Sequence, residues 1–364
     1  MPAALSMAVW LPLFEGEVAV PTLFAPRDWH AHEMLFGYVP AVLTGFLLTA
    51  IPNWTGRLPL QGMPLLFLVI VWAAGRFAVS YSAHLGWVLT AIIDGAFLLL
   101  VVGVTAREII AGQNWRNLKV LTPVTVLALA NAAFHVESHL SGAVEYALRT
   151  GVTAVLVLVM LIGGRIIPSF TRNWLARANP GRLPIPFGRF DMAALALSVA
   201  ALCLWIIAPD VLLSGAALCV AGILHVVRLA RWAGERTARE RLVLVLHVAY
   251  AFVPLGFALA GLAAFCLVVQ SAGLHAWMAG AVGTMTLAVM TRASLGHTGH
   301  ELVARIGTQA IYAAVVLAAL ARIAAALLPA SAMALIHVAA FAWIVAFGGF
   351  ALLYAPMLFQ ARGS

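Results

Sequence analysis

The sequence predicts an all-α polytopic membrane protein in which about twelve helices cross the bilayer. Of its 364 residues, 64% are hydrophobic and only 9% are charged, and its mean hydropathy is +1.02. A water-soluble protein of this length cannot bury so much apolar surface, whereas a bilayer removes the need to bury it. The composition therefore excludes a soluble enzyme and predicts a single transmembrane helical domain over residues 1–364.

Short polar connections separate twelve apolar stretches, and we expect one helix in each stretch. The first is shorter than the roughly 20 residues that a span needs, so we expect an incomplete first helix. No basic segment precedes it, so no cleavable signal peptide is expected. The stretches cover residues 2–14, 31–52, 63–81, 86–106, 120–139, 147–167, 191–207, 210–227, 242–268, 275–291, 304–327 and 331–358.

The basic residues test this count of helices. With the N-terminus in the cytoplasm, 17 of the 21 Lys and Arg residues fall on the cytoplasmic side, Arg228 among them in the connection after residue 227. This is the asymmetry that the positive-inside rule describes. We therefore expect both termini in the cytoplasm. The net charge of +8 is attributed to membrane orientation, and nucleic acid is not an expected partner.

Histidines stand in or beside several of the apolar stretches, where polar groups usually serve a function. Asn131, His135 and His139 recur four residues apart and so share one face of a helix. At the start of the second helix, His30 and His32 precede Glu33. Imidazole suits copper, zinc and iron. A polar stripe near water, or anchoring at the interface beside Trp29, is the alternative. The candidate metal ligands at the outer face are His30, His32, His135, His139 and His337.

Charged residues inside the spans form a second group of candidates. Arg76 and Asp94 lie on consecutive antiparallel helices and are predicted to pair. Arg322 has no evident carboxylate partner, so it could bind a haem propionate, or its side chain could extend to the interface. Arg76 and Arg322 are thus candidate cofactor-binding residues. Glu33 and Asp94 are the candidate catalytic residues, because they could relay protons.

The inner face offers a candidate haem site. His225 and His247 lie at similar depth on neighbouring antiparallel helices, as two axial ligands of a b-type haem would. A hydrogen-bonded packing pair is the alternative interpretation. His297 is the nearest substitute ligand on this side.

Four segments closely resemble the NnrS family: WHAHEMLFG at 29–37, GFLLTAIPNWTG at 45–56, GRIIPSFT at 164–171 and MTRASLGHTG at 290–299. The resemblance extends along the whole chain, although His300 stands where the family usually has Arg. It implies a bacterial inner-membrane protein of twelve helices that carries haem b and copper. It also implies a role in nitric oxide metabolism, denitrification and resistance to nitrosative stress.

The expected function is therefore that of a haem- and copper-containing membrane protein, in contact with lipid, that acts on nitric oxide. As an oxidoreductase it would reduce nitric oxide with electrons from a quinol or a redox protein; alternatively it binds nitric oxide without turnover. A haem–copper oxidase subunit is disfavoured, because no His-Pro-Glu-Val-Tyr motif occurs. A twelve-helix transporter is a weaker alternative, because the connection between the second and third helices holds only Arg57.

Overall fold

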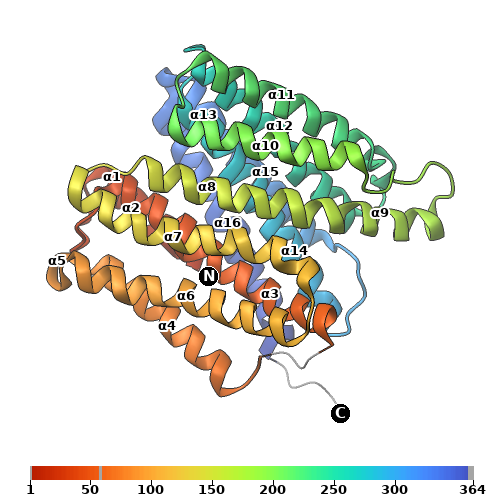
Figure 1. Cartoon of the computed structure of the whole chain (residues 1–364), viewed down its shortest axis with the longest axis horizontal. Helices are drawn as coiled ribbons and strands as arrows, with labels where there is room; N and C mark the ends of the chain where they lie inside the picture. The colour runs from red at the N-terminus through yellow and green to blue at the C-terminus, as the bar shows by residue number, and fades with distance from the viewer. Residues whose placement is uncertain (1, 57–59, 360–364) are drawn as a thin grey trace. The chain divides into compact units, whose positions relative to one another are not determined.

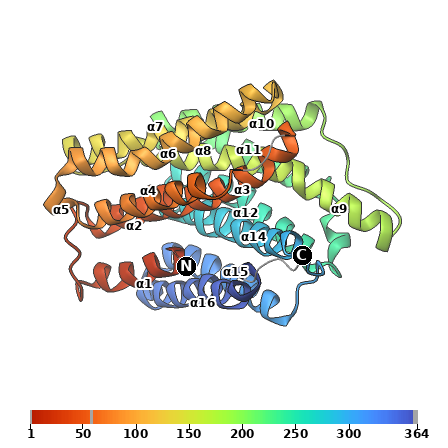
Figure 2. The same cartoon turned by 90° about the horizontal axis from the view of Figure 1, so that it is seen from below.

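The computed structural model describes residues 2–56 and 60–359 of the chain, and in this part the secondary structure is helical without a β-strand (Figures 1 and 2). Eleven helices among the described residues are long and apolar enough to cross a bilayer, which confirms the all-α polytopic membrane fold. Helix α1 (Pro2–Glu15) has 14 residues and is the short first helix that the sequence predicts. The chain divides into two compact units, residues 2–155 and residues 156 onward, with α8 crossing the boundary.

The first unit is built mainly from four long helical stretches. Helices α4, α6 and α7 pack in chain order, each beside the next (Figure 1). Helix α2 runs without a break through the π-helical segment η1 into α3, so these three elements form one membrane span. After α1, the elements are α2 (Pro26–His32), η1 (Glu33–Tyr38), α3 (Val39–Thr55), α4 (Met63–Ser80), α5 (Ser82–Leu85), α6 (Trp87–Ala111), η2 (Trp115–Asn117), α7 (Leu118–Ser141) and α8 (Tyr146–Leu158).

The second unit contains two closely packed helix pairs, α11 with α12 (Figure 1) and α15 with α16 (Figure 2). Helix α10 packs against α11. The elements are η3 (Val159–Gly163), α9 (Gly164–Ala178), α10 (Arg189–Ile207), α11 (Leu212–Ala230), η4 (Gly234–Thr237), α12 (Arg241–Ala264), α13 (Gln270–His275), η5 (Ala276–Gly283), α14 (Thr284–His297), α15 (Ile306–Leu327), η6 (Pro329–Ser331) and α16 (Ala332–Phe359).

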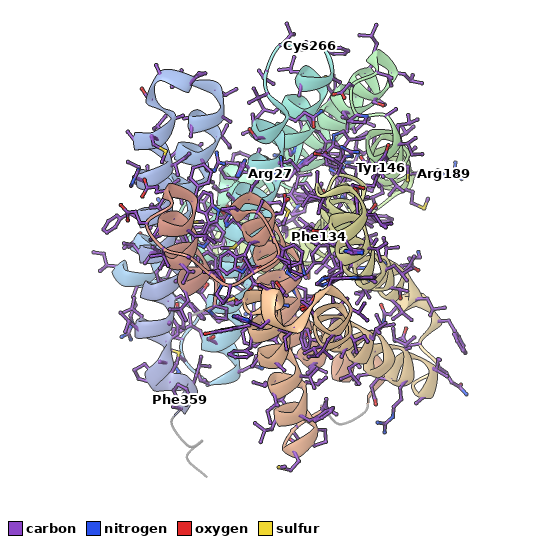
Figure 3. All side chains as sticks on the ribbon, turned by 90° about the vertical axis from the view of Figure 1, so that its left-hand side faces the viewer. Arg27, Phe134, Tyr146, Arg189, Cys266 and Phe359 are labelled. Atoms are coloured by element: carbon purple, nitrogen blue, oxygen red, sulfur yellow. The ribbon has the colours of Figure 1, made fainter. Side chains whose placement is uncertain are left out.

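The side chains that project from the outer faces of the helices are largely hydrocarbon (Figure 3). Ile70, Leu99, Leu140 and Phe341 are all exposed, as lipid-facing residues would be. Phe134, labelled in the same view, is fully buried inside the first unit. Since apolar groups lie on both the inner and the outer faces, the few charged groups at membrane depth carry most of the information about function.

Three of the described spans contain a π-helical segment: η1, η3 and η5. Such segments are rare and often lie at functional sites, because the wider turn changes how side chains and carbonyls are presented. Segment η1 begins directly after His32, and its Gly37 carbonyl accepts a hydrogen bond from Trp72 Nε1 at 2.9 Å. The widened turn therefore lies within the histidine-rich motif of the second span.

A candidate metal centre

Three helical elements of the first unit bring His32, Asp94 and His135 together. His32 is the last residue of α2, Asp94 lies in the first third of α6, and His135 lies in the last third of α7. All three side chains are almost completely buried. One ligand atom from each residue lies within 4.8 Å of the others. The two histidines and the aspartate predicted from different parts of the sequence thus form one cluster.

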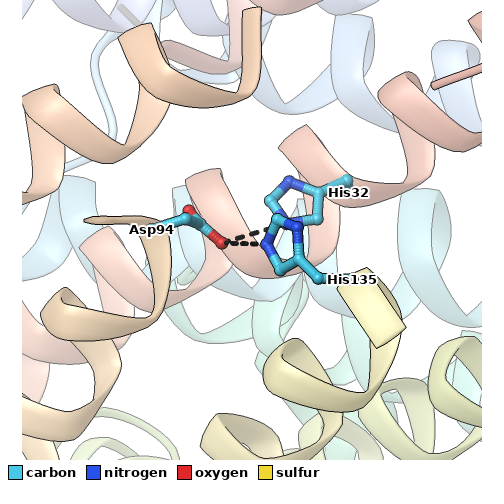
Figure 4. A group of neighbouring side chains, drawn as sticks. All are labelled: His32, Asp94 and His135. Carbon is cyan, nitrogen blue, oxygen red and sulfur yellow. Dashed lines mark hydrogen bonds and ion pairs between the residues drawn. The ribbon is translucent and has the colours of Figure 1, made fainter. Parts of the chain in front are cut away.

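The two imidazoles converge on a single carboxylate oxygen (Figure 4). Asp94 Oδ2 lies 3.1 Å from His32 Nε2 and 3.0 Å from His135 Nε2. In a four-coordinate metal site with bonds of about 2.0–2.1 Å, neighbouring ligand atoms are roughly 3.3 Å apart. The measured separations are close to that value. These separations also suit hydrogen bonds, and since all three atoms lie within 4.8 Å of one another, the cluster could hold one small cation.

Asn131 completes the polar group around Asp94. Its Nδ2 donates to Asp94 Oδ2 at 2.8 Å, and its Oδ1 lies 3.0 Å from His32 Nε2. Asn131 and His135 are one turn apart on α7 and face the same neighbours, as their spacing predicts. The amide orientation is fixed by this pair of contacts, because only the NH₂ group can donate to a carboxylate.

Neither tautomer of the two imidazoles satisfies the hydrogen bonds of the cluster. If both Nε2 atoms carry protons, they donate to Asp94, but both Nδ1 atoms are then buried acceptors with no hydrogen-bond partner among the described residues. If both Nδ1 atoms carry protons, these donors are unbonded and two Nε2 lone pairs face the carboxylate. Each unsatisfied buried group costs about 1–3 kcal/mol. A cation between Nε2, Nε2 and Oδ2 removes the clash of lone pairs.

Arg76 from α4 links the cluster to a second carboxylate. Its guanidinium donates to Glu33 Oε1 at 2.6 Å and to Asp94 Oδ1, which confirms the predicted pair of Arg76 with Asp94. Glu33 Oε1 also lies 3.6 Å from His32 Nδ1. Two carboxylates and one guanidinium leave one uncompensated negative charge when both imidazoles are neutral. Because unpaired charge is costly at membrane depth, the site would be stabilised by one added positive charge, which either a bound cation or a proton on an imidazole supplies.

Aromatic rings enclose the His32 side of the cluster. Phe24 stacks on the imidazole at 5.8 Å between ring centroids, and Phe134 meets it edge-on at 4.9 Å. Phe36 lies 5.4 Å away. All three phenyl rings are buried. This enclosure lowers the local dielectric, which strengthens both the Arg76 ion pairs and the attraction for a cation.

The other predicted outer ligands lie apart from this cluster or in the second unit. His30 packs against Trp10 at 4.3 Å, and His139 stacks on Trp87 at 4.5 Å. In the second unit, His337 lies exposed on α16, with its Nδ1 2.8 Å from the Met333 carbonyl of the same helix. Arg322 lies on α15 and forms no ion pair within the described part of the chain. Metal or cofactor binding by these four residues remains a prediction.

The predicted haem ligands His225 and His247 lie on adjacent helices, and both ring nitrogens of His225 make hydrogen bonds. The Ser198 hydroxyl donates to the Ala194 carbonyl at 2.7 Å, so His225 Nε2–H donates to Ser198 Oγ at 2.9 Å. The other ring nitrogen, Nδ1, lies 2.9 Å from the Tyr250 hydroxyl. Haem iron needs an imidazole lone pair, and both nitrogens of His225 are already in use. As placed, both ring nitrogens of His225 are therefore hydrogen-bonded, and haem binding by His225 remains a prediction.

His247 and His297 differ from His225. The Thr171 hydroxyl donates to the Ile167 carbonyl, so His247 donates its Nε2–H to Thr171 Oγ1 at 2.8 Å, while Nδ1 is buried with no partner among the residues that the structure describes. His297 lies at the exposed C-terminal end of α14. Haem binding by either residue remains a prediction.

The positive-inside count placed Arg228 in a cytoplasmic connection, and this placement is wrong. Helix α11 continues to Ala230, and the Arg228 guanidinium is completely buried. It donates to Asp191 Oδ1 and to the Met160 carbonyl, both at 3.1 Å, and to the Tyr250 hydroxyl at 2.7 Å. The Asp191 carboxylate neutralises the Arg228 guanidinium. Helix α11 can therefore continue past residue 227, where the apolar stretch of the sequence ends. The missed signal was a carboxylate at the same end of the neighbouring helix α10.

The comparisons with known proteins agree with the resemblance of the four motifs. No curated protein and no solved structure matches the chain. The family model described as NnrS protein matches residues 1–362, which is essentially the whole sequence. This multi-pass membrane protein, with its cluster of two histidines and an aspartate, therefore belongs to the NnrS family.

Proposed function

We propose that this protein binds a copper ion through His32, Asp94 and His135 and acts on nitric oxide in the bacterial inner membrane. The observation that carries the proposal is the convergence of both Nε2 atoms on one oxygen of Asp94, in a buried cluster with an uncompensated negative charge. The nitric oxide role rests on the family and on this donor set. We favour an oxidoreductase that reduces nitric oxide over a protein that only binds it. The electrons would come from a quinol or a redox protein.

The donor set fits a transition metal with an open position. Two imidazoles and one carboxylate are ligands that copper, zinc and iron accept, and three protein ligands leave room for a small exogenous molecule. Bound copper would supply a one-electron couple and a coordination position for nitric oxide. The same donors also hold iron(II) in other proteins, so metal analysis of protein purified without added metal distinguishes the two ions.

The surrounding residues would tune the site. Glu33, 3.6 Å from His32 Nδ1, is too distant for a hydrogen bond, but its negative charge would favour the tautomer with the proton on Nδ1 and with Nε2 free to bind a metal. Arg76 donates to both Glu33 and Asp94 and so holds the two carboxylates in place beside the cluster. Phe24, Phe36 and Phe134 would exclude water while admitting a small uncharged gas. Glu33 and Asp94 remain the candidate proton relays, since they are the carboxylates that touch the cluster.

The test is the metal content of purified single variants. His32→Ala and His135→Ala should each lose the bound metal and the nitric oxide response while the protein still inserts in the membrane, because an open three-ligand site cannot replace a lost ligand. His84→Ala is the control, since His84 is a histidine of the same unit that lies exposed on α5 and belongs to no predicted ligand set. Full metal content in both cluster variants would overturn the proposal.

The proposal that this protein also binds haem rests only on its resemblance to the NnrS family. An absorbance spectrum of the purified protein, with a Soret band that responds to dithionite and nitric oxide, would support it. A protein with neither haem nor metal would favour the transporter alternative.

A further inference from the structure

Tyr250 of the second unit is the centre of a hydrogen-bonded chain whose direction is fixed. A guanidinium can only donate, so the Tyr250 oxygen accepts from Arg228 NH1 at 2.7 Å. The phenolic proton is then directed at His225 Nδ1, 2.9 Å away. His225 donates from Nε2 to Ser198, which donates to the Ala194 carbonyl. Every proton in this buried chain has one assigned acceptor.

His225 is placed to receive the phenolic proton without rearrangement. After a transfer, Nδ1–H would donate back to the Tyr250 oxygen, and Nε2–H would still donate to Ser198. Asp191 balances the charge of Arg228 at 3.1 Å, so the pair adds no net charge beside the new imidazolium. A phenol with a pre-positioned base can lose an electron and a proton together, which avoids the high-energy phenol cation.

Aromatic rings continue from this chain in both directions. Trp232 meets Tyr250 at 4.6 Å between ring centroids, and Phe257 stacks on His225 at 5.5 Å with an interplanar angle of 4°. Trp277 then lies 5.2 Å from Phe257 and 5.3 Å from Trp205. All of these rings are buried. Packing alone explains aromatic contacts, but it does not explain a phenol aligned between a guanidinium and an imidazole.

We propose that Tyr250 is a redox-active tyrosine and that His225 is its proton acceptor. A one-electron oxidant of high potential takes one electron from Tyr250; the phenolic O–H bond breaks and an N–H bond forms at His225 Nδ1. The products are a neutral tyrosyl radical, an imidazolium and the reduced oxidant. The buried indoles provide short steps for the electron. This role is independent of the proposed metal centre and would use His225 as a base in place of a haem ligand.

Tyr312 provides the matched comparison within the same unit. It is also buried, but its hydroxyl is 2.6 Å from the Thr291 hydroxyl, and no imidazole is among its hydrogen-bond partners in the described residues. A threonine hydroxyl cannot hold an extra proton near neutral pH. Oxidation of Tyr312 would therefore lack a local base, and the radical should form at Tyr250 instead.

The experiment is photo-oxidation of the purified full chain with photogenerated tris(bipyridyl)ruthenium(III), followed by freezing and electron paramagnetic resonance. We expect a neutral tyrosyl radical that is lost in Tyr250→Phe and retained in Tyr312→Phe. His225→Gln, which keeps a hydrogen bond but cannot take the proton, should lose the signal as well. A tyrosyl signal that survives in Tyr250→Phe, or the absence of any tyrosyl signal in the wild type, would overturn the proposal.

A measurement on the wild-type protein tests the same proposal without any variant, in case the variants fail to fold. In protein labelled with ¹⁵N-histidine, pulsed resonance should detect hyperfine coupling between the tyrosyl radical and one imidazole nitrogen. A tyrosyl radical without that coupling would exclude His225 as the acceptor.

Discussion

At the scale of the residue, Asp94 is the group on which the candidate metal centre depends. It touches both imidazoles, the Asn131 amide and the Arg76 guanidinium. The sequence predicted the pairing with Arg76, because two opposite charges at equal depth on antiparallel neighbours have few other partners. It did not predict that His32 would meet the same carboxylate, since packing between distant spans leaves no mark on local spacing.

Replacing Asp94 with Asn should remove the metal and destabilise the first unit. The substitution deletes a ligand and leaves Arg76 with only Glu33 as an ionic partner. Breaking a buried pair by removing one side typically costs about 3–5 kcal/mol. Metal analysis and thermal unfolding in detergent would measure both effects. Unchanged metal content in Asp94→Asn would show that the carboxylate is not a ligand.

Glu33→Gln should weaken metal binding without abolishing it. Glu33 faces His32 Nδ1 but is not one of the three converging ligands. Partners of a ligating imidazole typically contribute about 10–100-fold in metal affinity. Titration of the metal-free protein would measure the change, with Glu108→Gln on α6 as the control carboxylate. Affinity equal to that of the wild type would remove Glu33 from the site.

At the scale of the element, the π-helical segment η1 shapes the cluster in a way that composition cannot predict. A single extra residue in a helical turn leaves the apolar pattern of the span almost unchanged. The segment presents Gly37 to Arg76 so closely that a Cβ atom there would overlap the guanidinium. The motif residues were recognisable in the sequence, but the widened turn that gives them their geometry was not.

Gly37→Ala should therefore displace Arg76 and weaken the metal site while leaving the helix intact. The added methyl group would push NH1 away from Glu33, to which it is bonded at 2.6 Å. We expect reduced metal affinity and a lower melting temperature, with an unchanged helical circular dichroism spectrum. Gly45→Ala on α3 is the control, since nothing lies within 4 Å of a Cβ atom at that position. Equal metal affinity in the two variants would contradict this account.

Helices α10 and α11 are joined by the buried pair of Asp191 and Arg228. Asp191→Asn should destabilise the protein by about 3–5 kcal/mol, because it leaves a guanidinium in the interior without a counter-charge. The double variant Asp191→Leu with Arg228→Met should recover part of this loss, since it removes both charges. Thermal unfolding of the three proteins in one detergent would measure the difference. A single variant as stable as the wild type would show that the pair is not structurally important.

At the scale of the whole molecule, composition and charge predicted most of the architecture. The apolar stretches identified the long helices, because a bilayer requires about 20 apolar residues per span. The boundaries were less reliable where a charge lies inside a helix, as Arg228 shows. Consecutive spans could be expected to pack together, but which spans far apart in the sequence pack together could not be predicted, because lipid-facing and buried surfaces are equally apolar.

The predicted topology has both termini in the cytoplasm. This prediction rests only on the unequal distribution of Arg and Lys between the two sides of the membrane. A reporter fused after Ser364 should be active in the cytoplasmic format and inactive in the periplasmic format. The two formats act as controls for each other. Activity only in the periplasmic format would reverse the assignment of the His32 cluster to the outer side.

X-ray absorption of the metal-bound protein at the copper edge tests the central claim most directly. The account predicts a first shell of nitrogen and oxygen atoms at about 2.0–2.1 Å, with the scattering pattern of two imidazoles, and no bound copper in His135→Ala. A sulfur ligand, a pattern without imidazole, or a protein that holds no metal at the cluster would contradict it.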